Sequence, residues 1–243
     1  MSYCFKTDIG KMRDKNEDSG DIFVNKDGDV FLAVLDGMGG HASGKTASHL
    51  ALKELKERIL KKDKFRTNIG MKMHIMRAIR AANNLVNEMG NASIEYRDMG
   101  TTLIFAALHK GKLSVFNIGD SRCYSIENDV LEQLSEDQTY VQFLYKTGKI
   151  SKDQMATHPK RHVLMNALGT YPSVTVVEKT YKRHFTQILL CSDGLYNMVE
   201  DNDIENVLKS TSKSTDEKVD ALISLANENG GKDNIAIALW EEK

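Results

Sequence analysis

Short apolar runs separated by turn sequences predict that the chain begins with β-strands. The segments 19–25 and 30–35 flank the sequence KDGD at positions 26–29, which is typical of a tight turn, so together they predict a β-hairpin. Similar apolar runs predict further strands at 101–108, 113–118, 123–126, 174–180, 187–191 and 235–240. Consecutive hairpins of this kind favour antiparallel pairing.

Other segments repeat their apolar residues at the spacing of a helix. Ala47, Ala51 and Leu55 recur every four residues within a predicted helix at 43–60. The same pattern predicts helices at 71–89, 201–209 and 216–227. Helices that alternate with groups of hairpin strands indicate an α+β fold, in which helices cover mostly antiparallel sheets.

The segment 136–170 fits neither pattern. It is polar and basic, and Gly148 and Pro159 interrupt it. We interpret it as an appendage that lies over the core. The whole chain of 243 residues is long enough for one large domain with a sizeable buried core, or for two small domains.

The composition of the chain argues against several functions and locations, but it does not indicate a particular activity. The net charge of −1 gives no overall attraction to nucleic acid or to an anionic membrane. Three cysteines without a CxxC pair favour a reducing compartment and argue against a thiolate zinc site. The charged N-terminus is unlike a signal peptide, and no apolar run approaches the roughly 20 residues of a membrane span. We therefore expect a cytoplasmic protein.

A glycine-rich loop at 36–46 has three interpretations. Gly39 to Thr46 match the P-loop pattern GxxxxGK[ST], while Gly37, Gly39 and Ala42 match a loosened dinucleotide fingerprint. Both require a parallel βαβ sheet, and the predicted hairpins argue against one. In the third interpretation, Asp36 and the Gly37 carbonyl offer oxygen ligands to a hard cation.

Further acidic residues stand at predicted turns and strand ends. Each alone is explained by hydrogen bonding to the local backbone, which is common for aspartate in turns. Together they supply the oxygen ligands that Mg²⁺ or Mn²⁺ needs, and the scarcity of histidine in these motifs argues against zinc. Besides Asp36 the group comprises Glu17 and Asp18, close to Arg13, and then Asp120, Asp193 and Asp233.

Seven short motifs occur in an order that spans almost the whole chain. They are RxxNED at 13–18, DGMGGH at 36–41, GTT at 100–102, GDSR at 119–122, ALG at 167–169, SDGL at 192–195 and GxDN at 231–234. In this order they resemble the protein phosphatase 2C family in its compact bacterial form. The resemblance implies a single catalytic domain over 1–243, with the segment 136–170 as a variable flap. It also implies an α-β-β-α sandwich of two mostly antiparallel sheets flanked by helices, with metals at one end.

The resemblance also assigns roles to individual positions. Asp36 would bridge two Mn²⁺ or Mg²⁺ ions, with the Gly37 carbonyl and Glu17 completing one site. Asp193 and Asp233 would complete the other site.

Three more residues receive roles in the same way. Asp120, together with Asp193, would hold a third, weaker metal, and Asp18 would bind through coordinated water. Arg13 would bind the substrate phosphate, because its planar fork matches two phosphate oxygens.

The implied reaction is hydrolysis of phosphoserine and phosphothreonine in proteins, by water activated between two divalent cations. The implied partners are phosphorylated proteins, including a bacterial Ser/Thr kinase and its targets in signalling, with the enzyme acting as a monomer. Neither nucleic acid nor a membrane is expected as a partner. The alternatives are a catalytically inactive phosphatase-like binding module and a P-loop NTPase acting through Gly39–Thr46.

Some positions depart from the family pattern. Met38 stands where many eukaryotic members have the histidine proposed as general acid, so the proton donor for the leaving group is not assigned. Asn197 stands where some members have an acid, which weakens the expected third metal site. Lys45 and Thr46 are atypical of the loop, and the simplest interpretation is that they begin a helix.

Overall fold

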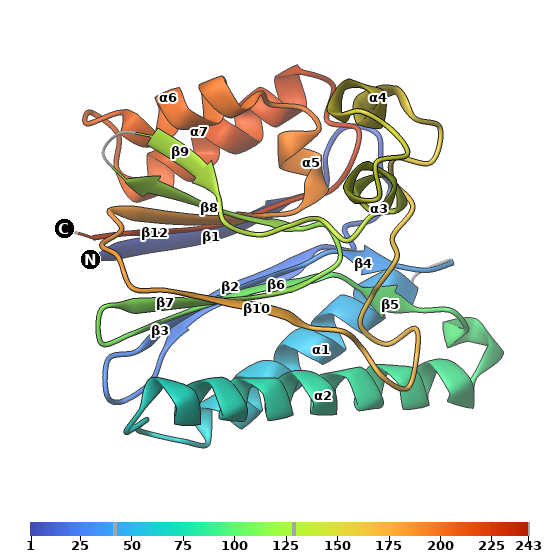
Figure 1. Cartoon of the computed structure of the whole chain (residues 1–243), viewed down its shortest axis with the longest axis horizontal. Coiled ribbons are helices and arrows are strands. Elements are labelled where there is room, and N and C mark those ends of the chain that lie inside the picture. Colours follow the sequence, from blue (N-terminus) through green and yellow to red (C-terminus); the bar gives the residue numbers. More distant parts are fainter. Residues whose placement is uncertain (41–42, 128–129, 243) are drawn as a thin grey trace.

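The computed structural model describes residues 1–40, 43–127 and 130–242, and it shows four layers (Figure 1). Two five-stranded sheets lie face to face. Helices α1 (Ser43–Leu60) and α2 (Asn68–Ala92) cover one sheet, and α6 (Asp201–Lys209) and α7 (Thr215–Glu228) cover the other. The α-β-β-α sandwich that the motifs implied is confirmed. None of the described helices is long and apolar enough to cross a bilayer.

Both sheets are antiparallel throughout the described residues. The first runs in the order β1 (Ser2–Asp8), β12 (Ile235–Glu241), β11 (Gln187–Cys191), β8 (Arg122–Glu127), β9 (Val130–Gln133). The second runs in the order β10 (Val177–Tyr181), β7 (Lys112–Ile118), β6 (Leu103–His109), β3 (Val30–Leu35), β2 (Ser19–Val24). A short separate pair joins β4 (Gly37–Met38) to β5 (Gly100–Thr101).

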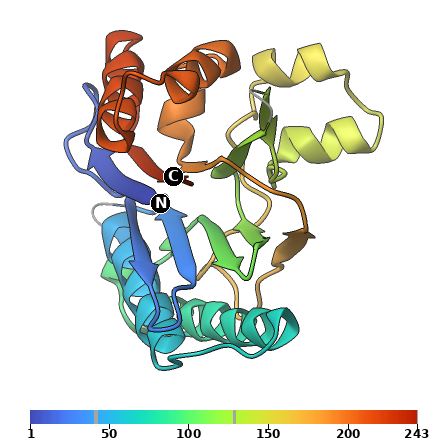
Figure 2. The same cartoon turned by 90° about the vertical axis from the view of Figure 1, so that its left-hand side faces the viewer.

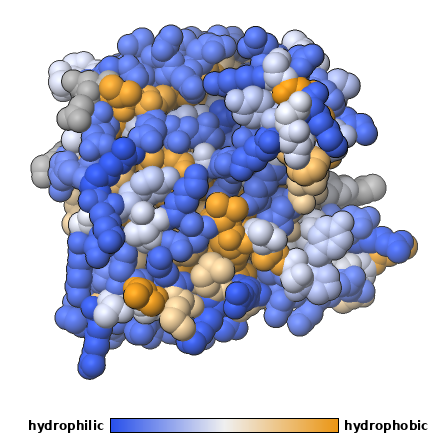
Figure 3. Space-filling view, viewed as in Figure 1, coloured by the Kyte–Doolittle hydropathy of each residue, from blue (hydrophilic) through white to orange (hydrophobic). Residues whose placement is uncertain are grey.

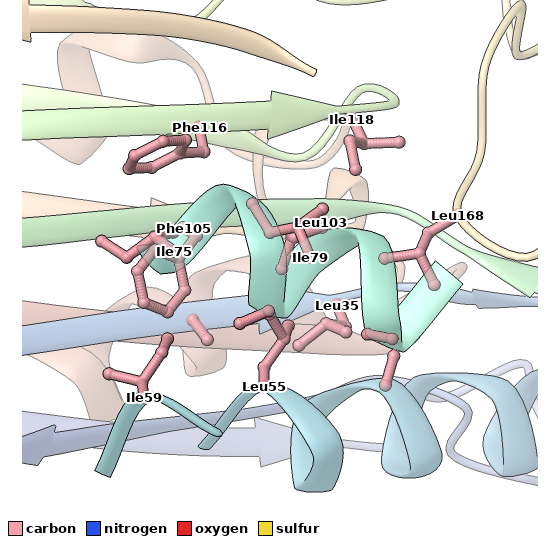
Figure 4. Close-up of a cluster of buried hydrophobic side chains, with 14 of the residues drawn as sticks. Leu35, Leu55, Ile59, Ile75, Ile79, Leu103, Phe105, Phe116, Ile118 and Leu168 are labelled. Atoms are coloured by element: carbon pink, nitrogen blue, oxygen red, sulfur yellow. The ribbon is translucent and has the colours of Figure 1, made fainter. Parts of the chain in front are cut away.

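The strand β3 shows why the sequences of several strands are continuous apolar runs, without alternating polar residues. All six of its residues are buried. Phe31, Ala33 and Leu35 pack toward α1 and α2, whereas Val30, Leu32 and Val34 pack between the two sheets. A strand covered on both faces carries no polar alternation. Figure 4 shows the helix side of this core, where Leu55, Ile75 and Phe105 meet.

The segment 136–170 carries two short helices, α3 (Tyr140–Lys146) and α4 (Lys152–Thr157). Figure 2 shows them standing beside the sandwich rather than covering a sheet face. The side chain of Asn83 on α2 holds the end of this segment, because it accepts from the Gly169 amide at 2.9 Å and donates to the Tyr171 carbonyl at 3.0 Å. On the face shown in Figure 3 the surface is mainly hydrophilic, and apolar side chains form small separate groups.

Several elements differ from those predicted. The helices α1 and α6 have the predicted bounds, but α2 is longer at both ends and begins after Thr67, whose hydroxyl accepts from the Gly70 amide at 3.0 Å. The strand predicted at 174–180 is shorter and begins at Val177. The strands β1, β4, β5 and β9, and the helices α3, α4 and α5 (Asp193–Tyr196), were not delimited. Most of them are short, so they carry little periodic signal.

Candidate active site

A cavity of about 660 Å³ lies where strands of both sheets end. Among the described residues, five carboxylates and three permanently positive side chains line it, so its lining is acidic on balance. The acids are Glu17, Asp36, Asp120, Asp193 and Asp233. The cations are Arg13, Arg161 and Lys232, and His162, Gly37 and Met38 also contribute. Every predicted site residue except Asp18 therefore lines one cavity, and Arg161, His162 and Lys232 line it too, although none of the three was predicted as a site residue.

The backbone of Asp36 is fixed by the GTT segment, whose role the sequence left unassigned. The Asp36 amide donates to the Thr102 hydroxyl at 2.9 Å, and the Asp36 carbonyl accepts from the Thr101 hydroxyl at 2.9 Å. The Thr102 hydroxyl also lies 2.7 Å from that of Ser121, in the turn that carries Asp120. These contacts fix the position of Asp36 relative to the turn that carries Asp120.

The glycines of the loop after β3 allow a close approach of backbone segments. A Cβ atom on Gly37 would lie 2.2 Å from the Gly44 carbonyl oxygen and 2.6 Å from that of Glu17. A Cβ on Gly44 would lie 2.9 Å from Glu17 Oε1. Glycine at both positions lets the start of α1 pack against β4 and the backbone of Glu17.

This packing accounts for Gly37 and Gly44, two of the glycines that matched nucleotide-binding patterns. Both patterns require a parallel βαβ unit, but β3 pairs antiparallel with β2 and β6. The P-loop and dinucleotide interpretations are therefore not favoured. Two of the positions concerned, His41 and Ala42, lie outside the described residues.

Asp193 begins the short helix α5 directly after β11. Its neighbour Ser192 donates to Asp18 Oδ2 at 2.6 Å and accepts from the Ala236 amide at 2.9 Å. Asp18 is thereby held in the interior, with 3% of its surface exposed. The side chain of Asn197 donates to Asp193 Oδ2 at 3.0 Å, so this residue orients a cavity carboxylate instead of adding another.

Asn234 brings the N-terminal motif against the last strand. Its side chain accepts from the Glu17 amide at 2.8 Å and donates to the carbonyls of Ile9 and Lys15 at 2.8 and 2.9 Å. The guanidinium of Arg13 then reaches Asp233, with Nη2 and Oδ2 2.7 Å apart. The only sequence signal for Asn234 was its place in the GxDN motif.

The turn that carries Asp120 is joined to the start of the segment 136–170. The Gly119 amide donates to Gln138 Oε1 at 3.0 Å, and the Tyr196 hydroxyl donates to the Asp120 carbonyl at 3.1 Å. Arg122 pairs with Asp137 at 2.7 Å and stacks 3.6 Å from the centre of the Tyr196 ring. The position of Asp120 therefore depends on the base of this segment.

The carboxylates destabilise one another's charges. Burial raises the pKa of Asp18 and of Asp120 to about 8 and that of Asp193 to about 6, and neighbouring carboxylates add to each shift. The pKa of Asp36 is likewise raised well above its usual range, by burial first and then by Asp18 and Asp193. A cluster of this kind favours either protons or cations among its oxygens.

The chemistry of the donors fits a hard divalent cation. The cavity offers carboxylate oxygens and the Gly37 carbonyl, the ligands that Mg²⁺ and Mn²⁺ prefer. Among the described residues, no three His, Cys, Asp or Glu side chains already stand as finished ligands of one ion. The type of donor, rather than a preformed ligand geometry, is what fits such a cation.

Comparison with known proteins agrees with the fold. Residues 11–239 match the model of a family described as protein phosphatase 2C. The chain is 38% identical over 238 residues to the serine/threonine phosphatase stp of Listeria welshimeri, covering 98% of this chain and 94% of that protein. It is 33% identical to the serine/threonine protein phosphatase PstP of Mycobacterium tuberculosis, covering 98% of this chain and 44% of that protein.

Solved structures show the same likeness. The serine/threonine phosphatase Stp1 from Staphylococcus aureus superposes with a TM-score of 0.93 at 33% identity, covering 99% of this chain and 94% of that one. This chain belongs to the protein phosphatase 2C family.

Proposed function

We propose that this protein hydrolyses phosphoserine and phosphothreonine in other proteins. The observation that carries the proposal is the convergence of five carboxylates and Arg13 in one cavity, from segments far apart in the sequence. Its relatives named as serine/threonine phosphatases support the same substrate class. A catalytically inactive binding module would have no need of so many mutually repelling acids.

Mn²⁺ or Mg²⁺ would be held by these acids, two ions per chain with a third bound more weakly. Asp36 would be shared between two ions, with Glu17 and the Gly37 carbonyl on one side and Asp193 and Asp233 on the other. Asp120 would serve the third ion together with Asp193, and Asp18 would act through water. When bound, such ions acidify water and neutralise charge on the phosphoryl oxygens.

Arg13 would bind the phosphate group. Its side chain lines the cavity, is half exposed and lies beside Asp233, so it can turn toward a bound phosphate without leaving the cavity. A guanidinium offers two parallel donors to two phosphate oxygens, and this fixes the orientation of the group as well as its position.

The proposed reaction also indicates which substrates the protein would act on in the cell. Substrates would be phosphorylated cytoplasmic proteins, among them a bacterial Ser/Thr kinase and its targets. The whole chain would act as a monomeric single domain, and the flap at 136–170 would govern the choice of substrate.

The deciding experiment measures phosphate release from phosphoserine, phosphothreonine and phosphotyrosine peptides with added Mn²⁺ or Mg²⁺, and after treatment with EDTA. We expect turnover of the first two peptides, and its loss in EDTA. No turnover with any metal would favour the inactive binding module, and full turnover in a verified metal-free sample would overturn the metal mechanism.

A further inference from the structure

The proposed reaction needs a proton that no residue has yet been assigned to give. When the P–O bond of a phosphoserine breaks, the serine oxygen leaves as a strongly basic alkoxide unless an acid protonates it. Met38 lines the cavity next to the loop glycines, but a thioether has no proton to give. The donor must therefore be another group that reaches the cavity.

His162 is the candidate with suitable chemistry. It lines the main cavity and also a second, adjoining cavity of about 290 Å³, so it stands where the two meet. Arginine and lysine side chains release protons only at strongly alkaline pH, and the carboxylates are the proposed cation ligands. Among the described residues that line the main cavity, His162 alone carries an imidazole, which exchanges protons near neutral pH.

Among the described residues that line the two cavities, Tyr196 carries the one phenolic hydroxyl, and that hydroxyl is already engaged. Tyr196 lines the second cavity, but its hydroxyl donates to the Asp120 carbonyl at 3.1 Å. Burial also raises its pKa well above the usual range for tyrosine. Tyr196 therefore supports the Asp120 turn and is a poor proton donor.

The backbone around His162 is fixed at the base of the flap. A turn holds it on both sides, because the Arg161 amide donates to the His158 carbonyl at 3.1 Å and the Val163 amide to the Lys160 carbonyl at 3.2 Å. The Val163 carbonyl in turn accepts from the Tyr140 amide at 2.8 Å. His162 is thus carried on a hydrogen-bonded segment.

The electrostatic surroundings suit an acid that must release its proton readily. Partial burial and the charge of Arg161 lower the pKa of His162, which is an exposed residue, and Asp233 opposes them. A phosphate dianion in the cavity would add to the effect of Asp233 and favour the protonated form when substrate binds. The charged groups that share the two cavities with His162 are Arg13, Glu17, Asp36, Asp120, Arg122, Asp137, Lys152, Arg161, Asp193, Lys232 and Asp233.

We propose that His162 is the general acid, the residue that gives a proton to the departing serine or threonine oxygen. A water oxygen forms a bond to phosphorus while the bond from phosphorus to the side-chain oxygen breaks. The imidazolium proton moves to that leaving oxygen and completes the free hydroxyl. The proton released by the attacking water returns, through solvent, to the imidazole. This proposal rests on the proposed phosphatase activity.

The test uses leaving groups of graded basicity. Phenyl phosphates that differ only in ring substituents bind alike, but they need the proton to different degrees. We expect His162→Gln to leave hydrolysis of p-nitrophenyl phosphate nearly unchanged, because that leaving group needs no proton. Turnover of a phosphoserine peptide should fall by about 10²-fold or more, and plots of log kcat against leaving-group pKa should become steeper.

A second readout and a control separate catalysis from damage to the fold. The alkaline limb of the kcat–pH profile for the phosphoserine peptide should disappear in His162→Gln, whereas His184→Gln, at an exposed site outside both cavities, should behave like wild type. Equal loss on every substrate, or no loss on any, would overturn the assignment of His162. Inactivity of the wild type on all substrates would instead overturn the proposed function.

Discussion

The charge of Asp36 is needed for its proposed function, but it destabilises the folded protein. The partly buried carboxylate of Asp36 lies close enough to those of Asp18 and Asp193 for their charges to act on it. Burial and these neighbours raise its pKa, so the ionised form is costly in the folded protein. Residues that stabilise a fold do not normally carry such a cost, which suggests that this carboxylate is kept for what it binds.

We expect Asp36→Asn to lower kcat by more than about 10³-fold, because it removes charge from a proposed bridging ligand. The melting temperature of the metal-free variant should equal or exceed that of the wild type, since a repelling charge has gone. Steady-state kinetics and thermal unfolding in EDTA measure the two effects.

Asp193→Ala should lower kcat by a similar factor, whereas Asp120→Ala should lower it less. A folded Asp36→Asn with near wild-type turnover would show that the assigned site is wrong.

Arg13 should act on phosphate binding rather than on the metals. Arg13→Ala should raise KM for a phosphopeptide by about 10-fold or more, as expected for loss of a charge-assisted hydrogen bond. Arg13→Lys should restore only part of the loss, because an ammonium lacks the two parallel donors. Metal affinity, measured by calorimetry, should change little in either variant. Full recovery with lysine would leave Arg13 only the role of a point charge.

At the residue scale, the sequence allowed prediction of the acidic residues of the site, but not of the residues that hold them in place by hydrogen bonds. The acids were predicted because several aspartates beside glycine at strand ends are unusual together. Their supporting partners, such as Thr102, Ser192 and Asn234, form hydrogen bonds across 66 to 217 positions of the chain. No local pattern encodes contacts at that separation, so only the folded chain reveals them.

At the scale of elements, the flap at 136–170 combines a fixed base with an exposed basic outer part. Its base is tied to the Asp120 turn through Gln138. Farther out, Lys152 lines the second cavity, Lys149 lies 5.7 Å over the Phe143 ring, and Lys146 pairs with Glu136. We expect these lysines to attract an acidic, phosphorylated protein surface.

Neutralising Lys146, Lys149 and Lys152 together should slow hydrolysis of a phosphoprotein, most strongly at low ionic strength, because salt screens such attraction. The rate on p-nitrophenyl phosphate should stay within about twofold, since none of the three lysines lines the main cavity, where so small a substrate would bind. The same number of changes at Lys53, Lys61 and Lys62, on and just after α1, serves as the matched control. Equal loss on both substrates would place the flap in the catalytic machinery, and no loss on either would leave it an inert surface.

Elements were predictable in proportion to their length and burial. The helix α1 has a continuous apolar stripe, and its bounds were predicted correctly. In contrast, β9 is a four-residue edge strand in which only Leu131 is partly buried, and α5 has a single turn. Such elements form because tertiary contacts hold them, so their sequences alone give little indication.

At the scale of the whole molecule, the cavity joins the two sheets. Asp36 and Asp120 follow β3 and β7 of one sheet, whereas Asp193 and Asp233 flank β11 and β12 of the other. Their mutual repulsion acts across the sandwich and favours separation of its two halves at this end. A cation bound between them would reverse that effect and stabilise the folded state by mass action.

We therefore expect Mn²⁺ or Mg²⁺ to raise the melting temperature as well as to support turnover. At a metal concentration about 100 times Kd, the free energy of unfolding should rise by about 2.7 kcal/mol. For a domain of this size, this corresponds to a rise in melting temperature of about 5–10 °C. Differential scanning calorimetry in EDTA and in metal measures it, with Asp36→Asn as the control that should lose most of the shift. An identical melting temperature in both conditions would show that no cation bridges the sheets. Because the acids repel without metal, the largest gain should come at pH 8, where more of the carboxyls are ionised than at pH 5.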